Sequence, residues 1–259
     1  MSINREIWKV PFRKDGLAVW KCPRCNIGML VLDQKTLVHY ETASSRSASH
    51  SEDWEPSWDS YSFTAAFRCN YKKCDEVITI VGTGQAEEFQ DFDDDGNYNS
   101  EYEVVYFPRF FSQPMRIFSV PVTCPDTVSS EISKSFNIFF ADSSAAANHI
   151  RNSVEELLTY FHVKRYDRID RKLRGISLHR RIRFYEKSNK AVAERLLAIK
   201  RLGNAASHPG GLTQDDVLDA YEILESVLSA LFDSKQRKLD RLVKNVNRLQ
   251  GPLRRGKTA

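Results

Sequence analysis

Four of the five cysteines form two pairs whose spacing is typical of a metal site. Cys22 and Cys25 stand in KCPRCNIG, and Cys69 and Cys74 stand in FRCNYKKCDE. Two short turns that each carry two thiolates supply the four soft ligands of a tetrahedral Zn²⁺ with little loss of chain entropy. Because four thiolates leave no coordination position for water, the spacing predicts a structural zinc and argues against a catalytic one.

Other interpretations of these cysteines stay open. They can be reduced, buried side chains without a metal, because the second pair has the looser C-x4-C spacing and 43 residues separate the pairs. His39 and His50 lie in that interval and can in principle replace a ligand, although no metal spacing points to them. Five cysteines are too few for a disulfide framework in a chain of 259 residues, and Cys124 stands alone.

A second set of reactive side chains lies in AERLLAIKRLGNAASHPGG. If residues 191–207 are helical, Arg201, Asn204 and His208 share one stripe at spacings i, i+3 and i+7. An outward arginine is a forked donor to phosphate oxygens, and an imidazole moves a proton near neutral pH, so the set suits phosphoryl chemistry. The alternative is a histidine that caps its own helix beside an arginine in a surface ion pair. The opposite face of the helix is apolar, and we expect it to be buried: Val192, Leu196, Ile199, Gly203 and Ala206.

The cysteine pairs need a β structure to hold them. The runs MLVL, SFTAAFR and VITIV flank the pairs and predict a small antiparallel sheet. The Ser-rich segment 41–60 predicts a long loop, whose Trp54 and Trp58 we expect to pack onto the sheet. The acidic run DFDDDGNYNSEYE does not fit a calcium-binding loop, because Tyr102 stands where the bidentate carboxylate belongs, and it predicts a hairpin tip instead.

The two halves of the chain differ in charge. Residues 1–125 carry 13 Lys or Arg against 18 Asp or Glu, whereas residues 126–259 carry 25 against 16. The net charges are therefore −5 and +9, and the basic half is the one expected to meet a polyanion or an acidic partner. Four prolines from Pro108 to Pro125 predict a connector, which places the domain boundary near residue 120.

The basic half has the apolar spacing of helices. Its breaks predict helices near 177–187 and 189–207, and Thr213 with Asp216 predicts the capped start of the next helix. We expect four or five helices in a bundle, followed by a basic disordered tail over 251–259.

This half also resembles a known family. The string IKRLGNAASHPG, with IRNSVEELL upstream and DDVLDAYEILESVLSALF downstream, resembles the bacterial family called domain of unknown function 4145, over roughly residues 105–250. That family is related to the HEPN superfamily of helical domains, and its members often carry an N-terminal zinc ribbon. Catalytic HEPN proteins cleave RNA without a metal, through an arginine and a histidine that usually meet across a dimer. The resemblance implies that Arg201, Asn204 and His208 are the catalytic set and that the RNA 2′-hydroxyl attacks the adjacent phosphorus.

The expected fold is α+β: a small N-terminal β zinc ribbon with a long insert and a connector over 1–120, then an all-α HEPN-like helical bundle over 121–250. The first functional hypothesis is a homodimeric endoribonuclease in a bacterial defence or toxin-like setting. One alternative is a non-catalytic module that binds nucleic acid, with RNA favoured, or a partner protein of a defence system.

A second alternative is a transcriptional regulator, because the C-N-x3-C knuckle is similar to that of phage-type zinc-ribbon activators.

The chain has no run of eighteen apolar residues and no signal-peptide pattern. We therefore expect a cytoplasmic protein that does not engage a membrane.

Overall fold

The computed structural model describes residues 3–15, 20–92, 98–205 and 211–252. The chain divides into two compact units. The first comprises Met1–Ile117 with Phe136–Ala146, and the second comprises Phe118–Ser135 with Ala147–Ala259.

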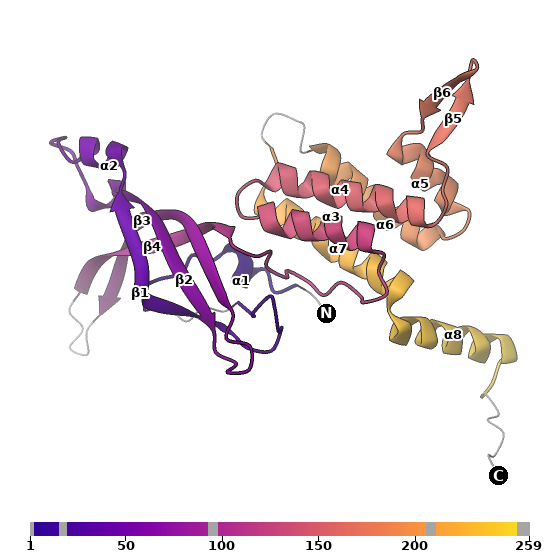
Figure 1. Cartoon of the computed structure of the whole chain (residues 1–259), viewed down its shortest axis with the longest axis horizontal. Coiled ribbons are helices and arrows are strands. Elements are labelled where there is room, and N and C mark those ends of the chain that lie inside the picture. Colours follow the sequence, from indigo (N-terminus) through magenta and orange to yellow (C-terminus); the bar gives the residue numbers. More distant parts are fainter. Residues whose placement is uncertain (1–2, 16–19, 93–97, 206–210, 253–259) are drawn as a thin grey trace, which may run out of the picture. The chain divides into compact units, whose positions relative to one another are not determined.

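The first unit is built on a four-stranded antiparallel sheet in the order β1-β2-β3-β4 (Figure 1). The strands are β1 (Leu30–Glu41), β2 (Ser60–Cys69), β3 (Val77–Phe92) and β4 (Tyr98–Phe111). Leu30 pairs with Cys69, and Arg68 pairs with Val77. The start of β1, the end of β2 and the start of β3 therefore lie together, and both cysteine pairs stand in the turns at that end.

The sheet is larger than the small ribbon that the sequence predicts. Strands β3 and β4 are 16 and 14 residues long, and the part of the expected connector up to Phe111 belongs to β4. Pro108 is tolerated because β4 is an edge strand, and the register shifts opposite it, between Val81 and Gly82. The proline-rich run was interpreted as a connector, whereas its first part pairs with β3 as an edge strand.

The core of this unit is aromatic. In β2, Phe63, Ala65, Phe67 and Cys69 are buried at every second position, which is the alternation of a half-buried strand. The ring of Phe12, from the segment that follows α1 (Glu6–Lys9), lies 5.2 Å from that of Phe67. These rings anchor the sheet beside the cysteine turns.

The segment between β1 and β2 is not the plain loop that was expected. It contains α2 (Ala43–Ala48), which Thr42 caps by accepting a hydrogen bond from the N–H of Ser45, and the 3-10 helix η1 (Pro56–Trp58). Trp54 and Trp58 remain 37% and 47% exposed. The acidic run predicted as a hairpin tip, residues 91–103, covers the end of β3 and the start of β4, where Phe92 pairs with Tyr98; residues 93–97 are outside the described part.

The rest of the chain is mainly helical. Its helices are α3 (Asp126–Ile138), α4 (Ser143–Tyr160), α5 (Leu178–Glu186), α6 (Lys190–Ala205), α7 (Gln214–Phe232) and α8 (Ser234–Leu249). The predicted capping box is confirmed: Thr213 accepts from the N–H of Asp216, and the Asp216 carboxylate accepts from the N–H of Thr213. The apolar residues Ile150, Val154, Leu157 and Leu158 of α4 are buried. The hydroxyls of Ser135 and Tyr221 share a buried hydrogen bond of 2.7 Å.

This half is not all-α, and the predicted fold class is wrong on this point. Strands β5 (Tyr166–Ile169) and β6 (Lys172–Gly175) form an antiparallel hairpin between α4 and α5. Asp170 and Arg171 have φ of 52° and 61°, as in a type I′ turn. The chain is α+β with a four-stranded sheet in place of the small zinc ribbon, and a helical region with a β-hairpin in place of the all-α HEPN-like bundle.

The described residues include no helix that is both long enough and apolar enough to cross a membrane.

Candidate functional site

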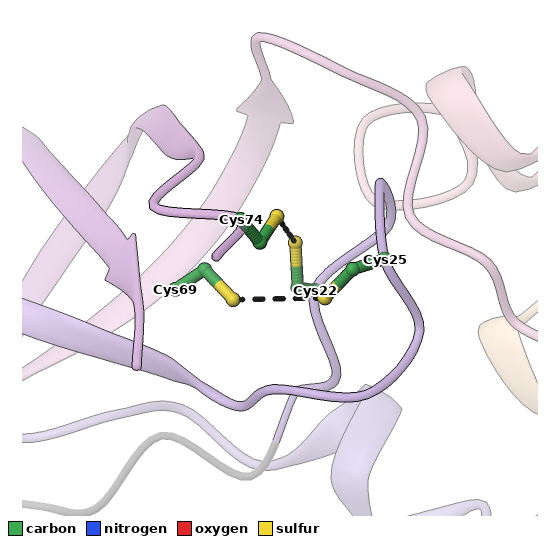
Figure 2. A group of neighbouring side chains, drawn as sticks. All are labelled: Cys22, Cys25, Cys69 and Cys74. Carbon is green, nitrogen blue, oxygen red and sulfur yellow. Dashed lines mark hydrogen bonds between the residues drawn. The ribbon is translucent and has the colours of Figure 1, made fainter. Parts of the chain in front are cut away.

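The structure brings the four predicted cysteines together (Figure 2). Their Sγ atoms all lie within 4.8 Å of one another, with 3.8 Å between Cys22 and Cys74 and 3.7 Å between Cys25 and Cys69. Four sulfurs at Zn–S distances of about 2.3 Å in a tetrahedron lie about 3.8 Å apart, so the spacing suits a metal ion of that size. The cluster can hold a metal ion, and neither His39 nor His50 belongs to it.

The first turn is shaped around Cys25. The N–H groups of Ile27 and Gly28 donate to its Sγ at 3.5 and 3.4 Å, and the N–H of Cys22 donates to the Gly28 carbonyl at 2.8 Å. A Cβ on Gly28 would lie 2.5 Å from the Sγ of Cys69. Glycine is needed here because the two turns approach each other too closely for any side chain.

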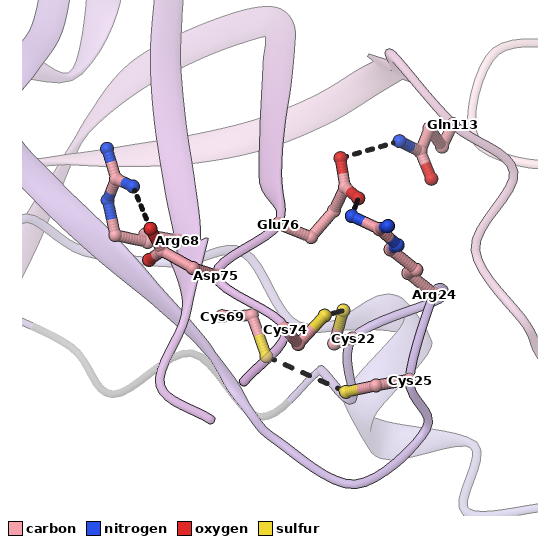
Figure 3. A network of polar contacts seen from close by, with 9 residues as sticks. All are labelled: Cys22, Arg24, Cys25, Arg68, Cys69, Cys74, Asp75, Glu76 and Gln113. Carbon is pink, nitrogen blue, oxygen red and sulfur yellow. Dashed lines mark hydrogen bonds and ion pairs between the residues drawn. The ribbon is translucent and has the colours of Figure 1, made fainter. Parts of the chain in front are cut away.

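An ion pair connects the second turn to the first (Figure 3). Arg24, inside the first pair, donates to the Glu76 carboxylate at 2.9 Å, and Gln113 donates to the other oxygen of Glu76 at 3.0 Å. Asn70 connects the backbones, because its side-chain oxygen accepts from the N–H of Met29 at 2.9 Å. These contacts fix the positions of the turns without using the cysteine side chains.

The thiols differ in acidity. Hydrogen bonds from the N–H of Gly28 and then of Ile27 lower the pKa of Cys25 to about 6. Burial raises the pKa of Cys69 to about 12 and also raises the pKa of Cys74. A divalent cation among them favours the thiolate form of all its ligands, so metal binding releases protons here.

Cys124 is buried outside this cluster, and burial raises the pKa of its thiol to about 11. It has the environment of an inert structural cysteine.

The second set of predicted residues is only partly described. Arg201 and Asn204 are exposed on α6, whereas His208 lies outside the described residues. The expected apolar face is buried at Val192, Leu196 and Ile199, and Ala206 is outside the described residues. A Cβ on Gly203 would lie 3.4 Å from the Cβ of Arg151, so α6 passes close to α4 at this glycine.

The structure also shows a basic surface that the sequence reasoning missed. Residues 164–190 carry eleven Lys or Arg against three Asp or Glu. The β5–β6 hairpin projects from the helices (Figure 1), and every residue of β6 is exposed. Its exposed cations are Arg168, Arg171, Lys172 and Arg174. The excess of Lys and Arg over residues 164–190 could have been read from the sequence. It does not show that these side chains are grouped on a hairpin.

Helix α5 extends this basic surface. The side chains of Arg180 and Arg183 are each 52% exposed. Asp167 on β5 is shared by Lys164 at 2.7 Å and Arg180 at 3.6 Å, and its pKa is lowered chiefly by the hydrogen bond from Lys164. Glu186 pairs with Arg183 at 2.9 Å, but the surface keeps a net positive charge because Lys and Arg outnumber Asp and Glu over residues 164–190.

Two families match separate parts of the chain. Residues 10–111 match the family described as Domain of unknown function (DUF8608), and residues 133–249 match the family described as Domain of unknown function (DUF4145). The second match confirms the similarity to that family that IKRLGNAASHPG indicates. Comparison with curated proteins gives no match, and comparison with solved structures gives none either.

Proposed function

We propose that this protein binds nucleic acid through the basic surface formed by the β5–β6 hairpin and α5. The observation that carries this proposal is the projecting hairpin, whose exposed arginines stand on both strands and in the turn. The forked guanidinium groups of these arginines match the phosphate oxygens of a nucleic-acid backbone, which RNA and DNA share. The net charge of +9 over residues 126–259 supports the same partner class.

The cysteine cluster supports this function indirectly. We assign Zn²⁺ to it, because four thiolates at tetrahedral spacing are its preferred closed set. Such a site supplies folding energy to the sheet, while the turns themselves leave no open position for a reactant.

Binding is tested by fluorescence anisotropy with labelled RNA and DNA over a series of KCl concentrations. The variant Arg168→Ala/Arg171→Ala/Arg174→Ala removes three cations from the hairpin. Its slope of log K against log salt should be smaller by about 2, because each phosphate contact contributes about 0.7–0.9 to that slope. The control variant Lys14→Ala/Lys35→Ala/Lys72→Ala removes three exposed cations from the first unit and should leave the slope unchanged.

An unchanged slope in the hairpin variant would show that this surface does not carry the binding. A strong preference of the wild type for duplex DNA over RNA would favour the regulator hypothesis over an RNA-directed role.

The second candidate function is RNA cleavage by Arg201, Asn204 and His208. It is favoured by the exposure of Arg201 and Asn204 on the side of α6 away from its buried face. In this mechanism the 2′-oxygen bonds to phosphorus as the P–O5′ bond breaks, which leaves a 2′,3′-cyclic phosphate and a 5′-hydroxyl. His208 takes the proton of the attacking 2′-hydroxyl and the leaving 5′-oxygen gains a proton, while Arg201 stabilises the charged phosphorane. DNA lacks that hydroxyl and should be spared.

Cleavage is tested on mixed RNAs in the presence of EDTA, with the folded state measured in the same sample because chelation can remove a structural metal. His208→Ala should abolish cleavage, and matched DNA should stay intact. If the site is completed across a homodimer, mixing inactive Arg201→Ala and His208→Ala protomers should restore part of the activity. Absence of cleavage by the wild type, together with salt-sensitive binding, would reject this candidate and retain the first.

A further inference from the structure

A cleft lies at the base of the β5–β6 hairpin. It has a volume of about 640 Å³ and lies between the turn that follows α4 and the end of α5 with the turn after it. Lys164, which precedes β5 by two residues, belongs to its lining. The cleft therefore continues directly from the basic surface described above.

One wall of the cleft is aromatic. The rings of Phe161 and Tyr185 lie 5.3 Å apart, and Tyr185 is buried, so these two rings form a fixed apolar base. Phe184 also lines the cleft and remains 36% exposed. The guanidinium of Arg180 lies 5.4 Å from the centroid of the Phe184 ring, which restricts the ring and adds a positive charge beside it.

The other lining groups are polar. Ser188 and Asn189 contribute a hydroxyl and an amide, and the Asn189 Oδ1 accepts from the N–H of Val192 at 3.2 Å. That bond orients the amide and leaves its NH₂ as a donor. Lys164 is 62% exposed and pairs with Asp167 at 2.7 Å, and the other N–H groups of its ammonium can donate to an anion beside the cleft.

A buried arginine fixes one wall of the cleft. Arg181 is 2% exposed, and its Nη2 donates to Thr159 Oγ1 at 2.9 Å and to the carbonyl of Val163 at 3.3 Å. Val163 lines the cleft, so this contact fixes one wall against α5. A wall that is already ordered lowers the entropy lost when a ligand binds.

We infer that this cleft takes one unpaired nucleobase, which makes single-stranded nucleic acid the preferred ligand; the inference rests on the proposed function. The base stacks on Phe184, the polar groups contact its edge, and Lys164 contacts the adjoining phosphate. This combination of an aromatic platform with cations along the backbone is the usual means of single-strand binding. A base inside a duplex is already stacked and paired, so it reaches the cleft only at the cost of leaving the helix.

The test uses short RNA and DNA strands that contain 2-aminopurine, whose fluorescence is quenched by stacking. Wild-type protein should quench the single strands and bind them more tightly than the matching duplexes. Phe184→Ala should weaken single-strand binding by about 5- to 150-fold, the equivalent of one base–aromatic stack, without changing the salt slope. Phe184→Tyr should restore both affinity and quenching, and Phe110→Ala, at a 50% exposed ring in the first unit, is the control.

Lys164→Gln should lower the salt slope by about 1, as expected for one phosphate contact. RNA and DNA single strands distinguish a contact to the base, which both provide, from a contact to the 2′-hydroxyl.

If the wild type binds nucleic acid but Phe184→Ala retains full affinity and quenching, the cleft inference fails and the proposed function stands. If the wild type binds neither RNA nor DNA at low salt, the proposed function fails as well. Equal binding of a polyglutamate peptide would overturn both, because the surface would then be selecting acidic chains rather than bases and phosphates.

Discussion

Gly28 is the position where the smallest change should most damage the metal site. An alanine Cβ at this position would lie 2.5 Å from the Sγ of Cys69 and 2.8 and 2.9 Å from the Cβ and backbone nitrogen of Tyr71. Ordinary contacts begin near 3.4 Å, so Cys69 or the backbone of the second turn must move by about 1 Å. Metal–ligand distances tolerate only about 0.2 Å.

The expected cost of Gly28→Ala follows from these two effects. Overpacking of a tight site costs about 1–3 kcal/mol, and disturbance around metal ligands lowers affinity by about 10–100-fold. A loss of about 2 kcal/mol should lower the unfolding temperature of the first unit by roughly 4–8 °C. Metal release to a chromophoric chelator and thermal unfolding measure the two quantities on the same sample.

The matched control is Gly175→Ala, at the end of β6. A Cβ there meets nothing within 4 Å. It should therefore change stability by less than about 0.5 kcal/mol and leave the metal in place. Equal metal affinity and equal unfolding temperatures for Gly28→Ala and the wild type would refute the argument that close approach of the turns requires glycine.

The remaining predictions concern metal, capping and buried polar groups. Cys25→Ser, or a strong chelator, should lower the unfolding temperature of the first unit more than Cys124→Ser does, because Cys124 lies outside the cluster. Thermal unfolding followed by circular dichroism, together with zinc quantification, checks this. Thr213→Ala should destabilise the helical region by about 1 kcal/mol, whereas Thr213→Asn should retain the cap, as measured by urea unfolding. Hydrogen bonds from the Thr213 side chain and N–H lower the pKa of Asp216. The ionised carboxylate therefore contributes to the free energy of unfolding above its ordinary pKa of 3.8, and this contribution should be lost as pH falls through the still lower pKa of the folded state. A free energy of unfolding in urea that does not change over this acid range would contradict the prediction. Ser135→Ala and Tyr221→Phe should each cost about 1–3 kcal/mol but together less than their sum, a coupling that a double-mutant cycle in urea detects.

Local spacing was enough to predict several parts of this protein. The cysteines of each pair are near neighbours in a turn, so C-x2-C and C-x4-C indicate a shared site before any fold is known. The cap at Thr213 also depends on residues three apart, and the structure contains it. In α7, Val217, Tyr221, Leu224 and Leu228 recur at the three- and four-residue spacing of a helix, and all four are buried.

The errors arose where local signals were weak or misleading. Pro108 suggested a connector, but an edge strand does not need the missing N–H, so β4 continues through it. Every residue of β6 is exposed, and the turn of the hairpin uses Asp170 and Arg171 rather than glycine, so neither periodicity nor turn chemistry predicts this hairpin.

The sequence by itself determined which residues can bind a metal and which helix faces are buried, because both depend on neighbours along the chain. Only the tertiary structure decided that Glu76 contacts Arg24 and Gln113 beside the cysteines. It also decided that Lys164 and Phe184 line one cleft at the base of the β5–β6 hairpin. Such groupings join residues from separate segments, and they exist only after strand pairing and helix packing have placed those segments side by side.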